Sequence, residues 1–214
     1  LIDEDGKVVA PGSFLPAAER YNLMPTIDRW VIAEVCRRYR VLVARLGAPL
    51  VCAINLSGTS LNAEGLADYI LAQTQEHGVE PTSLCFEITE TAAINNLSRT
   101  AELMKGLRDR GFRFALDDFG TGTSSFGYLR SLPVDYLKID GSFVREMDKD
   151  PMDRAMAESI NRIGHIMGLK TVGEFAENDL VIGELAAIGV DFAQGYGVER
   201  PQTAPTALAS LVSV

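Results

Sequence analysis

Two adjacent carboxylates, Asp117 and Asp118, end an apolar segment of the sequence, which then continues as glycine, threonine and serine (ALDDFGTGTSS, 115–125). Neighbouring carboxylates raise the cost of ionising one another, and a bound cation removes that cost. Taken alone, such a pair is most often part of a solvated turn. The pair becomes informative if polar residues from other parts of the chain meet it.

Five further apolar runs also close on a polar side chain. The six runs are PLVCAIN, SLCFEIT, FRFALDD, VDYLKID, KTVGE and VDFAQG, and their polar residues are Asn55, Glu87, Asp117, Lys138, Glu174 and Gln194. Successive polar residues lie between 20 (174 to 194) and 36 (138 to 174) positions apart, which leaves room for one helix between two strands. The pattern predicts six strand–helix units with a polar group at the end of each strand.

A segment with helical periodicity, followed by a glycine, precedes five of these runs, whereas VDYLKID follows Leu132-Pro133. The predicted helices span 26–46, 61–77, 94–110, 152–167 and 178–188, and the glycines are Gly47, Gly78, Gly111, Gly168 and Gly189. Glycine is the residue that most easily ends a helix in the left-handed conformation. Continuous apolar strands that alternate with helices predict a parallel sheet covered by helices.

The six polar strand ends converge only if the sheet closes, because an open sheet would spread them along one edge. We therefore predict an α/β fold, a modified TIM (β/α)8 barrel with its active site at the carboxyl ends of the strands. Such barrels typically have eight strands and ~250 residues, whereas this chain has 214 residues and about six visible βα units. We expect residues 1–214 to form an N-terminally truncated barrel that lacks its first strands.

The convergent residues Asn55, Glu87, Asp117, Asp118 and Glu174 offer only oxygen ligands. Hard divalent cations such as Mg²⁺ or Mn²⁺ prefer this set. Lys138 adds a positive charge that can orient a water, stabilise a developing negative charge or, with a lowered pKa, act as a base. Two reactions fit these residue types equally: hydrolysis of a phosphate ester, and proton abstraction beside a metal-bound carboxylate as in enolase-like barrels.

Six ordered motifs strongly resemble the EAL-domain family of cyclic di-GMP phosphodiesterases. They are INLS (54–57), FEITE (86–90), DDFGTGTSS (117–125), LPVDYLKID (132–140), GEFAE (173–177) and AQGY (193–196), and the resemblance covers essentially the whole chain. It implies a modified (β/α)8 barrel that hydrolyses cyclic di-GMP to linear pGpG with two Mg²⁺ or Mn²⁺ ions.

The resemblance also implies roles for individual residues. Asn55, Glu87 and Asp117 would ligate one metal, and Asp117 would bridge to a second metal held also by Asp118 and Glu174. Lys138 would contact the attacking water. Supporting roles fall to Glu90, which would anchor the loop after Asp118, to Glu177 and Gln194, and to Asp140, which we expect near the site.

The sequence departs from the family pattern in two places. The Glu-Ala-Leu segment, with a metal-binding glutamate and a nearby arginine that contacts substrate, is absent, so we expect weak metal binding and little activity if the molecule begins at Leu1. Phe175 stands where the family usually has glycine, which predicts a narrower or reshaped pocket. An alternative function is therefore a receptor that binds cyclic di-GMP without hydrolysing it. An enolase-like lyase or isomerase would need a second base on another strand end, and none is evident.

The overall composition limits the possible partners and the setting. With 47% hydrophobic residues, the chain is predicted to be a soluble globular domain. Its net charge of -9 predicts that it does not bind a nucleic-acid polymer. Its three cysteines lack CxxC spacing, and no run approaches the ~18 apolar residues of a membrane span. We expect a cytoplasmic domain, fused to N-terminal sensory or GGDEF domains and without membrane contact of its own.

The long glycine-rich loop after Asp118 (120–133) predicts a further property. In the family this region links the metal site to a dimer interface. We therefore expect a homodimer, with Tyr128 and Leu129 as candidate interface residues.

Overall fold

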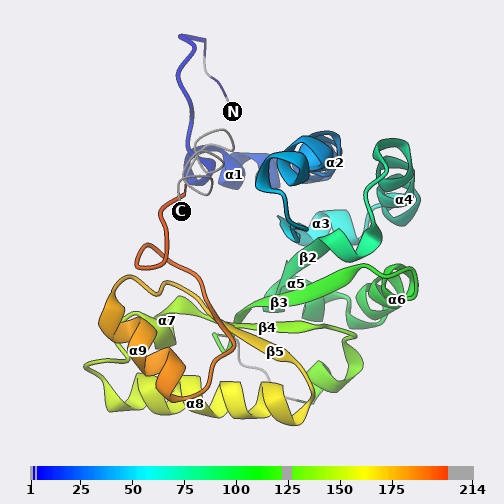
Figure 1. Ribbon diagram of the computed structural model, residues 1–214. Helices are drawn as coiled ribbons and strands as arrows, with labels where there is room; N and C mark the ends of the chain where they lie inside the picture. Colours follow the sequence, from blue (N-terminus) through cyan, green and yellow to red (C-terminus); the bar gives the residue numbers. More distant parts are fainter. Residues whose placement is uncertain (1, 3, 122–126, 202–214) are drawn as a thin grey trace.

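The computed structural model describes residues 2, 4–121 and 127–201 and shows six parallel strands in one curled sheet (Figure 1). Their spatial order follows the chain: β1 Cys52–Asn55, β2 Leu84–Thr89, β3 Arg113–Phe119, β4 Tyr136–Ile139, β5 Lys170–Gly173 and β6 Phe192–Ala193. All six predicted strands are present, and the predicted α/β class with a parallel sheet is confirmed. The sheet forms a half-barrel, with β1 and β6 as its two edges.

Helices connect most successive strands and cover the outer face of the sheet; between β3 and β4 the described residues form only a 3-10 turn. They are α1 Pro11–Arg20, α2 Met24–Leu46, α3 Gly58–Leu61, α4 Leu66–His77, α5 Glu90–Asn95, α6 Leu97–Arg108, α7 Gly141–Val144, α8 Pro151–Ile166 and α9 Asp179–Ala187, with single 3-10 turns η1 Pro81–Ser83 and η2 Tyr128–Ser131. Each of the five predicted helices is found, and the five glycines predicted to end them all have positive φ. No helix in the described part of the chain is long and apolar enough to cross a membrane.

Three details of the helix prediction are wrong. The segments 61–77 and 94–110 were each expected as one helix, but the chain breaks near Asn62 and at Asn96 and forms the short helices α3 and α5 ahead of α4 and α6. Helix α1 was not predicted, because Pro16 lies inside it and proline usually argues against a helix interior. The first turn of α1 also starts at a proline, Pro11, which is a favoured helix start.

The core lies between the sheet and the helices. Side chains alternate along each strand, so that Phe86, Phe114 and Leu137 point outward while Glu87 and Lys138 take the opposite face. The three outward side chains are fully buried. Burial of such side chains stabilises the fold by roughly 1.5–3 kcal/mol each. This outer core holds the strands in place, and the opposite face is left for the polar residues that the sequence singled out.

Two aspartates at the beginning of strands hold the sheet together at its amino-terminal end. Asp135 accepts a hydrogen bond from the backbone N–H of Phe114 (3.0 Å) and pairs with Arg108 (2.9 Å). Asp191 likewise accepts from the backbone N–H of Thr171 (2.9 Å) and pairs with His165 (2.9 Å). Each aspartate therefore fixes the preceding strand to its own and also contacts the helix that leads into that preceding strand.

The spacing of these two contacts relates them to the polar strand ends. Lys138 and Gln194 each lie three residues after the aspartate of their own strand, and Asp117 and Glu174 each lie three residues after the N–H donor. The same local bond thus sets the register of β3 on β4 and of β5 on β6. It brings both pairs of polar residues to the same height in the half-barrel.

Replacing Asp191 with asparagine is expected to lower the free energy of unfolding by about 1–3 kcal/mol at pH 7, because charge-assisted hydrogen bonds are lost. Burial alone would raise the pKa of Asp191, but hydrogen bonds from Lys170, Thr171 and His165 outweigh burial and lower it. The stabilisation is therefore present above the unfolded pKa of about 3.9 and is lost as the pH falls through the lowered folded pKa. Urea unfolding from pH 7 down to about pH 2 measures how the stability difference between the wild type and Asp191→Asn shrinks below about pH 4, with Asp109→Asn as an exposed control. A deficit that is the same at every pH would contradict the assignment.

Candidate active site

The strand that carries Asp117 and Asp118 is irregular at these two residues. The pairing of β3 with β4 runs regularly through Leu116↔Leu137 and resumes at Phe119↔Ile139, so that two residues of β3 oppose the single residue Lys138. Asp118 has a φ of 54°, a left-handed conformation that is uncommon for a residue with a side chain. Such a β-bulge redirects side chains, which in a regular strand would point to opposite faces.

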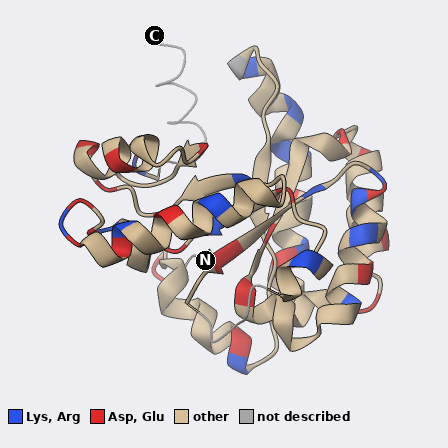
Figure 2. Ribbon diagram, turned by 90° about the horizontal axis from the view of Figure 1, so that it is seen from below, with Lys and Arg blue, Asp and Glu red and all other residues tan. Residues whose placement is uncertain are grey.

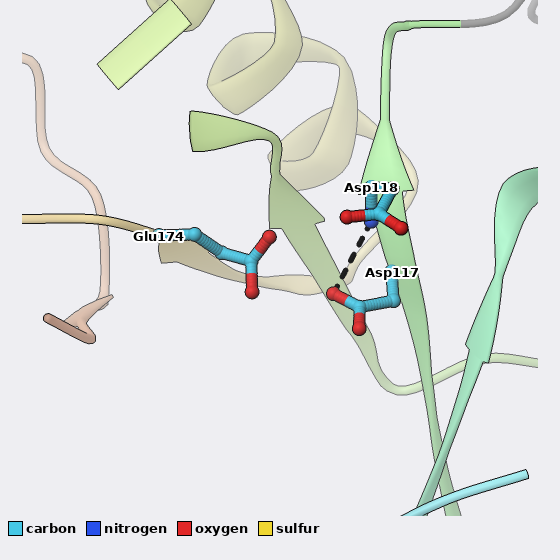
Figure 3. A group of neighbouring side chains, drawn as sticks. All are labelled: Asp117, Asp118 and Glu174. Atoms are coloured by element: carbon cyan, nitrogen blue, oxygen red, sulfur yellow. Dashed lines mark hydrogen bonds between the residues drawn. The ribbon is translucent and has the colours of Figure 1, made fainter. Parts of the chain in front are cut away.

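The bulge brings both carboxylates to the same place. Figure 3 shows the side chains of Asp117, Asp118 and Glu174 around a common space, with the backbone N–H of Asp118 donating to Asp117 Oδ1 at 3.2 Å. One oxygen from each of the three carboxylates lies within 4.8 Å of the others. Glu174 directly follows β5, two strands away from β3, so the curl of the sheet makes this convergence possible.

Lys138 lies at the centre of the polar face of the sheet. Its Nζ is 2.8 Å from Asp117 Oδ1, 2.8 Å from Glu174 Oε1 and 3.0 Å from Glu87 Oε2, and only 4% of its side chain is exposed. Burial would lower the pKa of this lysine, but the three carboxylates outweigh burial and raise it. In the metal-free arrangement Lys138 is therefore held in its protonated form, which does not favour the alternative in which it acts as a base with a lowered pKa.

For two of the carboxylates, burial and crowding disfavour the charged form, and their pKa values are raised. Burial raises the pKa of Glu174 to about 7, with Asp117 adding to the effect and Lys138 opposing it. Burial also raises the pKa of Asp118, and the neighbouring carboxylates of Asp117 and Asp140 raise it further. One lysine is thus insufficient to neutralise the cluster.

The donor set fits divalent metal ions. Glu174 Oε2 is buried and has no hydrogen-bond partner among the described residues. Asp117, Asp118 and Glu174 supply only carboxylate oxygens within reach of a single ion, and hard cations such as Mg²⁺ and Mn²⁺ prefer oxygen ligands. An ion would satisfy the orphaned oxygen and offset the negative charge that Lys138 leaves uncompensated.

Glu90 connects the site to the chain that follows β3. Its carboxylate is buried at the start of α5 and accepts hydrogen bonds from the backbone N–H of Gly120 (3.0 Å) and from the hydroxyl of Tyr128 (2.6 Å). Residues 122–126 of the glycine-rich loop lie outside the described residues. Leu129 was expected at a dimer interface, but it is fully buried in the core, so that prediction is wrong. The sequence had also not indicated the contact between Tyr128 and Glu90.

The other predicted site residues lie around this cluster rather than in it. Asn55 ends β1 beside Glu87 in register, with an exposed side chain. Asp140 accepts from the backbone N–H of Ser142 (2.8 Å) at the start of α7. Glu177 and Gln194 are exposed and line a cavity of about 490 Å³ that also reaches Glu174. All ten predicted residues thus lie near the carboxyl ends of the strands or within a few residues beyond them.

Charge elsewhere on the protein is mixed. Figure 2 shows basic and acidic segments interspersed over the helices, with acidic segments also among the central strands. The three cysteines are unpaired, and Cys36 and Cys85 are buried. The acidic strand ends are therefore the main chemical feature of the described residues.

Curated relatives match almost the whole chain. It is 48% identical over 197 residues to the cyclic di-GMP phosphodiesterase PdeB of Shewanella oneidensis, covering 92% of this chain but 23% of that protein. It is 35% identical over 204 residues to the bifunctional diguanylate cyclase/cyclic di-GMP phosphodiesterase MucR of Pseudomonas aeruginosa, covering 95% of this chain and 30% of that protein. The chain therefore spans about a quarter to a third of the length of these relatives.

Solved structures share the fold. The PaMucR phosphodiesterase in complex with c-di-GMP superposes with a TM-score of 0.90 at 33% identity, covering 96% of this chain and 83% of that chain. The FimX EAL domain of Pseudomonas aeruginosa bound to c-di-GMP gives a TM-score of 0.84 at 28% identity, covering 94% of this chain and 81% of that chain. The family model described as "EAL domain" matches residues 1–201. The chain therefore belongs to the EAL domain family, as its motifs predicted.

Proposed function

We propose that this domain is a metal-dependent phosphodiesterase that hydrolyses cyclic di-GMP to linear pGpG. The observation that carries the proposal is the cluster of Asp117, Asp118 and Glu174, in which one buried carboxylate oxygen of Glu174 has no hydrogen-bond partner within the described ranges of the chain. The relatives named as cyclic di-GMP phosphodiesterases support the choice of substrate. An acidic site that handles an anionic phosphodiester needs cations, and the cluster is suited to bind them.

Two metal sites account for the oxygen ligands at the strand ends. Asn55, Glu87 and Asp117 would hold one Mg²⁺ or Mn²⁺, and Asp117, Asp118 and Glu174 would hold the other. When bound, such a pair of ions stabilises the attacking and leaving oxygens of an in-line displacement. The β-bulge supports this assignment, because it directs the two adjacent aspartates into one space.

Residues of the chain itself supply the remaining functions. The protonated Nζ of Lys138 donates a hydrogen bond to the attacking water and stabilises negative charge on the phosphoryl oxygens. Glu90 holds Gly120 and Tyr128 and so fixes the backbone that follows Asp118. Asp140, Glu177 and Gln194 border the cluster and help to orient the substrate.

The reaction needs one water and no other co-reactant. The water oxygen forms a bond to phosphorus, and the bond from phosphorus to the ribose 3′-oxygen breaks. The proton released by the water ends on the leaving 3′-oxygen. The product is the linear dinucleotide with a 5′-phosphate and a free 3′-hydroxyl.

Asn55→Ala is expected to reduce the kcat for cyclic di-GMP by about 10- to 100-fold, because one oxygen ligand is lost while the carboxylate cluster persists. The measurement is the appearance of pGpG with Mg²⁺ or Mn²⁺, resolved by chromatography. Gln75→Ala, which removes an exposed amide from α4, is the matched control and should behave like the wild type.

Two results would contradict the proposal in different ways. Binding of cyclic di-GMP without hydrolysis by the wild type would favour the receptor alternative. Hydrolysis that Asn55→Ala does not slow would remove Asn55 from the metal site. Proton abstraction of the enolase type has less support, since Lys138 is held in its protonated form.

The setting of the domain is proposed from the relatives. MucR is named as bifunctional, and this chain covers 30% of it, so we propose that the domain acts within a longer signalling protein that carries sensory or GGDEF segments. The homodimer and the cytoplasmic location expected from the sequence stay predictions.

A further inference from the structure

Phe175, the residue after Glu174, has an unusual backbone conformation. Its φ is 50°, and among the described residues the only other non-glycine residues with positive φ are Asn22 and Asp118. A bulky residue in this region is strained, and glycine would adopt the same conformation without strain. Strain of this kind persists where the surrounding structure fixes the residue, and it clusters at functional sites.

The Phe175 side chain is held by the end of the neighbouring strand. Its ring covers Gly141, where any Cβ would overlap the ring atoms. Gly141 begins α7 directly after Asp140, three residues beyond Lys138. The ring therefore joins the end of β5, which leads into Glu174, to the end of β4, which carries Lys138.

A guanidinium group lies on this ring. The Cζ atom of Arg145 is 4.0 Å from the ring centroid of Phe175, in the range of a cation–π contact. Arg145 is exposed, and no carboxylate among the described residues forms an ion pair with it. An arginine oriented by an aromatic ring keeps its donors available for an anion, and planar groups stack on it.

The Phe175 side chain, which Arg145 contacts, lines the cavity that also reaches Glu174. Phe175 is 42% exposed and lines the cavity of about 490 Å³ together with Glu174, Gln194 and Tyr196. The walls therefore include aromatic surface next to a proposed metal ligand. Nucleobases stack on aromatic rings and on guanidinium planes, and phosphates take bidentate hydrogen bonds from arginine.

We propose that Phe175 and Arg145 form a subsite that binds a purine base and its adjoining phosphate and thereby determines substrate specificity. The proposal rests on the proposed function, because it assigns part of the same substrate. It also gives the strained conformation of Phe175 a role: the ring holds the guanidinium of Arg145 next to the residue that follows Glu174, and this positive charge favours an anionic substrate. Gly141 leaves the space that the ring requires.

Arg145→Met and Phe175→Gly are expected to raise the KM for cyclic di-GMP by about tenfold with less than a twofold change in kcat, since each removes binding and leaves the reacting groups in place. Arg162→Met, which removes an exposed arginine from α8, is the matched control for the loss of charge. Equal KM values for Arg145→Met and Arg162→Met would overturn the subsite.

A second set of variants tests the position of the ring. Gly141→Ala should raise the KM as Phe175→Gly does, because the new Cβ displaces the ring. The double variant Gly141→Ala/Phe175→Gly should be no worse than Phe175→Gly alone, since the two changes act on one contact. Strictly multiplicative effects would show that the ring and residue 141 do not act together. Thermal unfolding of each variant checks that it folds.

The outcomes separate this proposal from the proposed function. If the wild type hydrolyses cyclic di-GMP but the variants match their control, only the subsite is wrong. If the wild type binds without hydrolysis, the enzyme proposal fails, and the same variants are compared by calorimetric Kd with Ca²⁺ present; a tenfold weaker Kd for Arg145→Met supports the subsite and an unchanged Kd overturns it. A wild type that neither binds nor hydrolyses the dinucleotide overturns both.

Discussion

Replacing Lys138 with methionine is expected to reduce hydrolysis of cyclic di-GMP by about 10²- to 10⁴-fold and to destabilise the metal-free protein by about 3–5 kcal/mol. The lysine is 4% exposed and lies within 3.0 Å of Asp117, Glu87 and Glu174. Methionine keeps the apolar part of the side chain but removes the only cation among these three carboxylates that the described residues supply. Their mutual repulsion then acts in a buried place, where the solvent screens it poorly.

Metal ions should separate the two effects of this substitution. Added Mn²⁺ binds the carboxylates and replaces the missing charge, so the stability of Lys138→Met should recover toward that of the wild type. The activity should not recover, because the hydrogen-bond donor to the reacting groups is still absent. Urea unfolding with and without Mn²⁺ and steady-state kinetics measure the two quantities.

Lys149→Met is the control for Lys138→Met, since Lys149 is exposed and remote from the strand ends. A metal-free Lys138→Met protein as stable as the wild type would contradict the prediction. It would mean that the neighbouring carboxylates do not depend on the lysine for charge compensation.

The strands were predictable because of how parallel sheets are built. Each strand is covered on one face by helices and lines the half-barrel with the other, so its sequence is a short apolar run such as LCFEIT, closed by a turn. The polar residue at the end of each run, such as Asn55 or Lys138, interrupts an otherwise apolar pattern. The site could therefore be predicted as a set of strand ends before the structure was known.

The bulge at Asp117 and Asp118 could not be predicted from the sequence. Two neighbouring strand residues normally face opposite sides, and only the extra residue opposite Lys138 brings both carboxylates into the cluster. Similarly, Leu129 follows a polar loop and was expected on the surface, yet η2 turns its side chain into the core. Both outcomes depend on pairing between distant segments, which local sequence patterns do not encode.

Phe175 and Arg145 illustrate the same limit. The phenylalanine was recognised as a departure from the family pattern, but its contact with Arg145 joins residues 30 positions apart (145 to 175). The signal that could have suggested the contact is Gly141, since a glycine directly after the strand VDYLKID provides space for a neighbouring ring. Such a glycine indicates a contact only when the segment that faces it is known.

Glu174→Gln is expected to weaken Mn²⁺ binding by about 100-fold or more and to reduce activity by about 10³-fold, because it removes a carboxylate that the proposed second metal requires. The change keeps the size of the side chain and its contact with Lys138. It also removes a titrating group whose pKa burial raises to about 7.

The raised pKa of Glu174 gives this prediction a pH signature. Metal binding requires the carboxylate form, so the wild type should release a proton on binding Mn²⁺ below pH 7, and its affinity should fall by up to about tenfold per pH unit there. In the absence of metal, the raised pKa of Glu174 instead makes the folded protein more stable at low pH than at high pH. The folded protein binds the proton more tightly than the unfolded chain, so this contribution to stability is full below about pH 4.3 and is lost as the pH rises through about 7.

Calorimetric titration of Mn²⁺ at pH 6 to 8 in two buffers of different ionisation enthalpy counts the protons released. The wild type should release up to one proton more than Glu174→Gln at pH 6 and the same number at pH 8. Glu102→Gln, an exposed substitution on α6, should match the wild type at both values. Equal proton release by the wild type and Glu174→Gln at pH 6 would mean that Glu174 is ionised before the metal arrives. The buried Glu174 side chain would then be a carboxylate compensated by Lys138 alone, and the need for a second cation at this strand end would disappear.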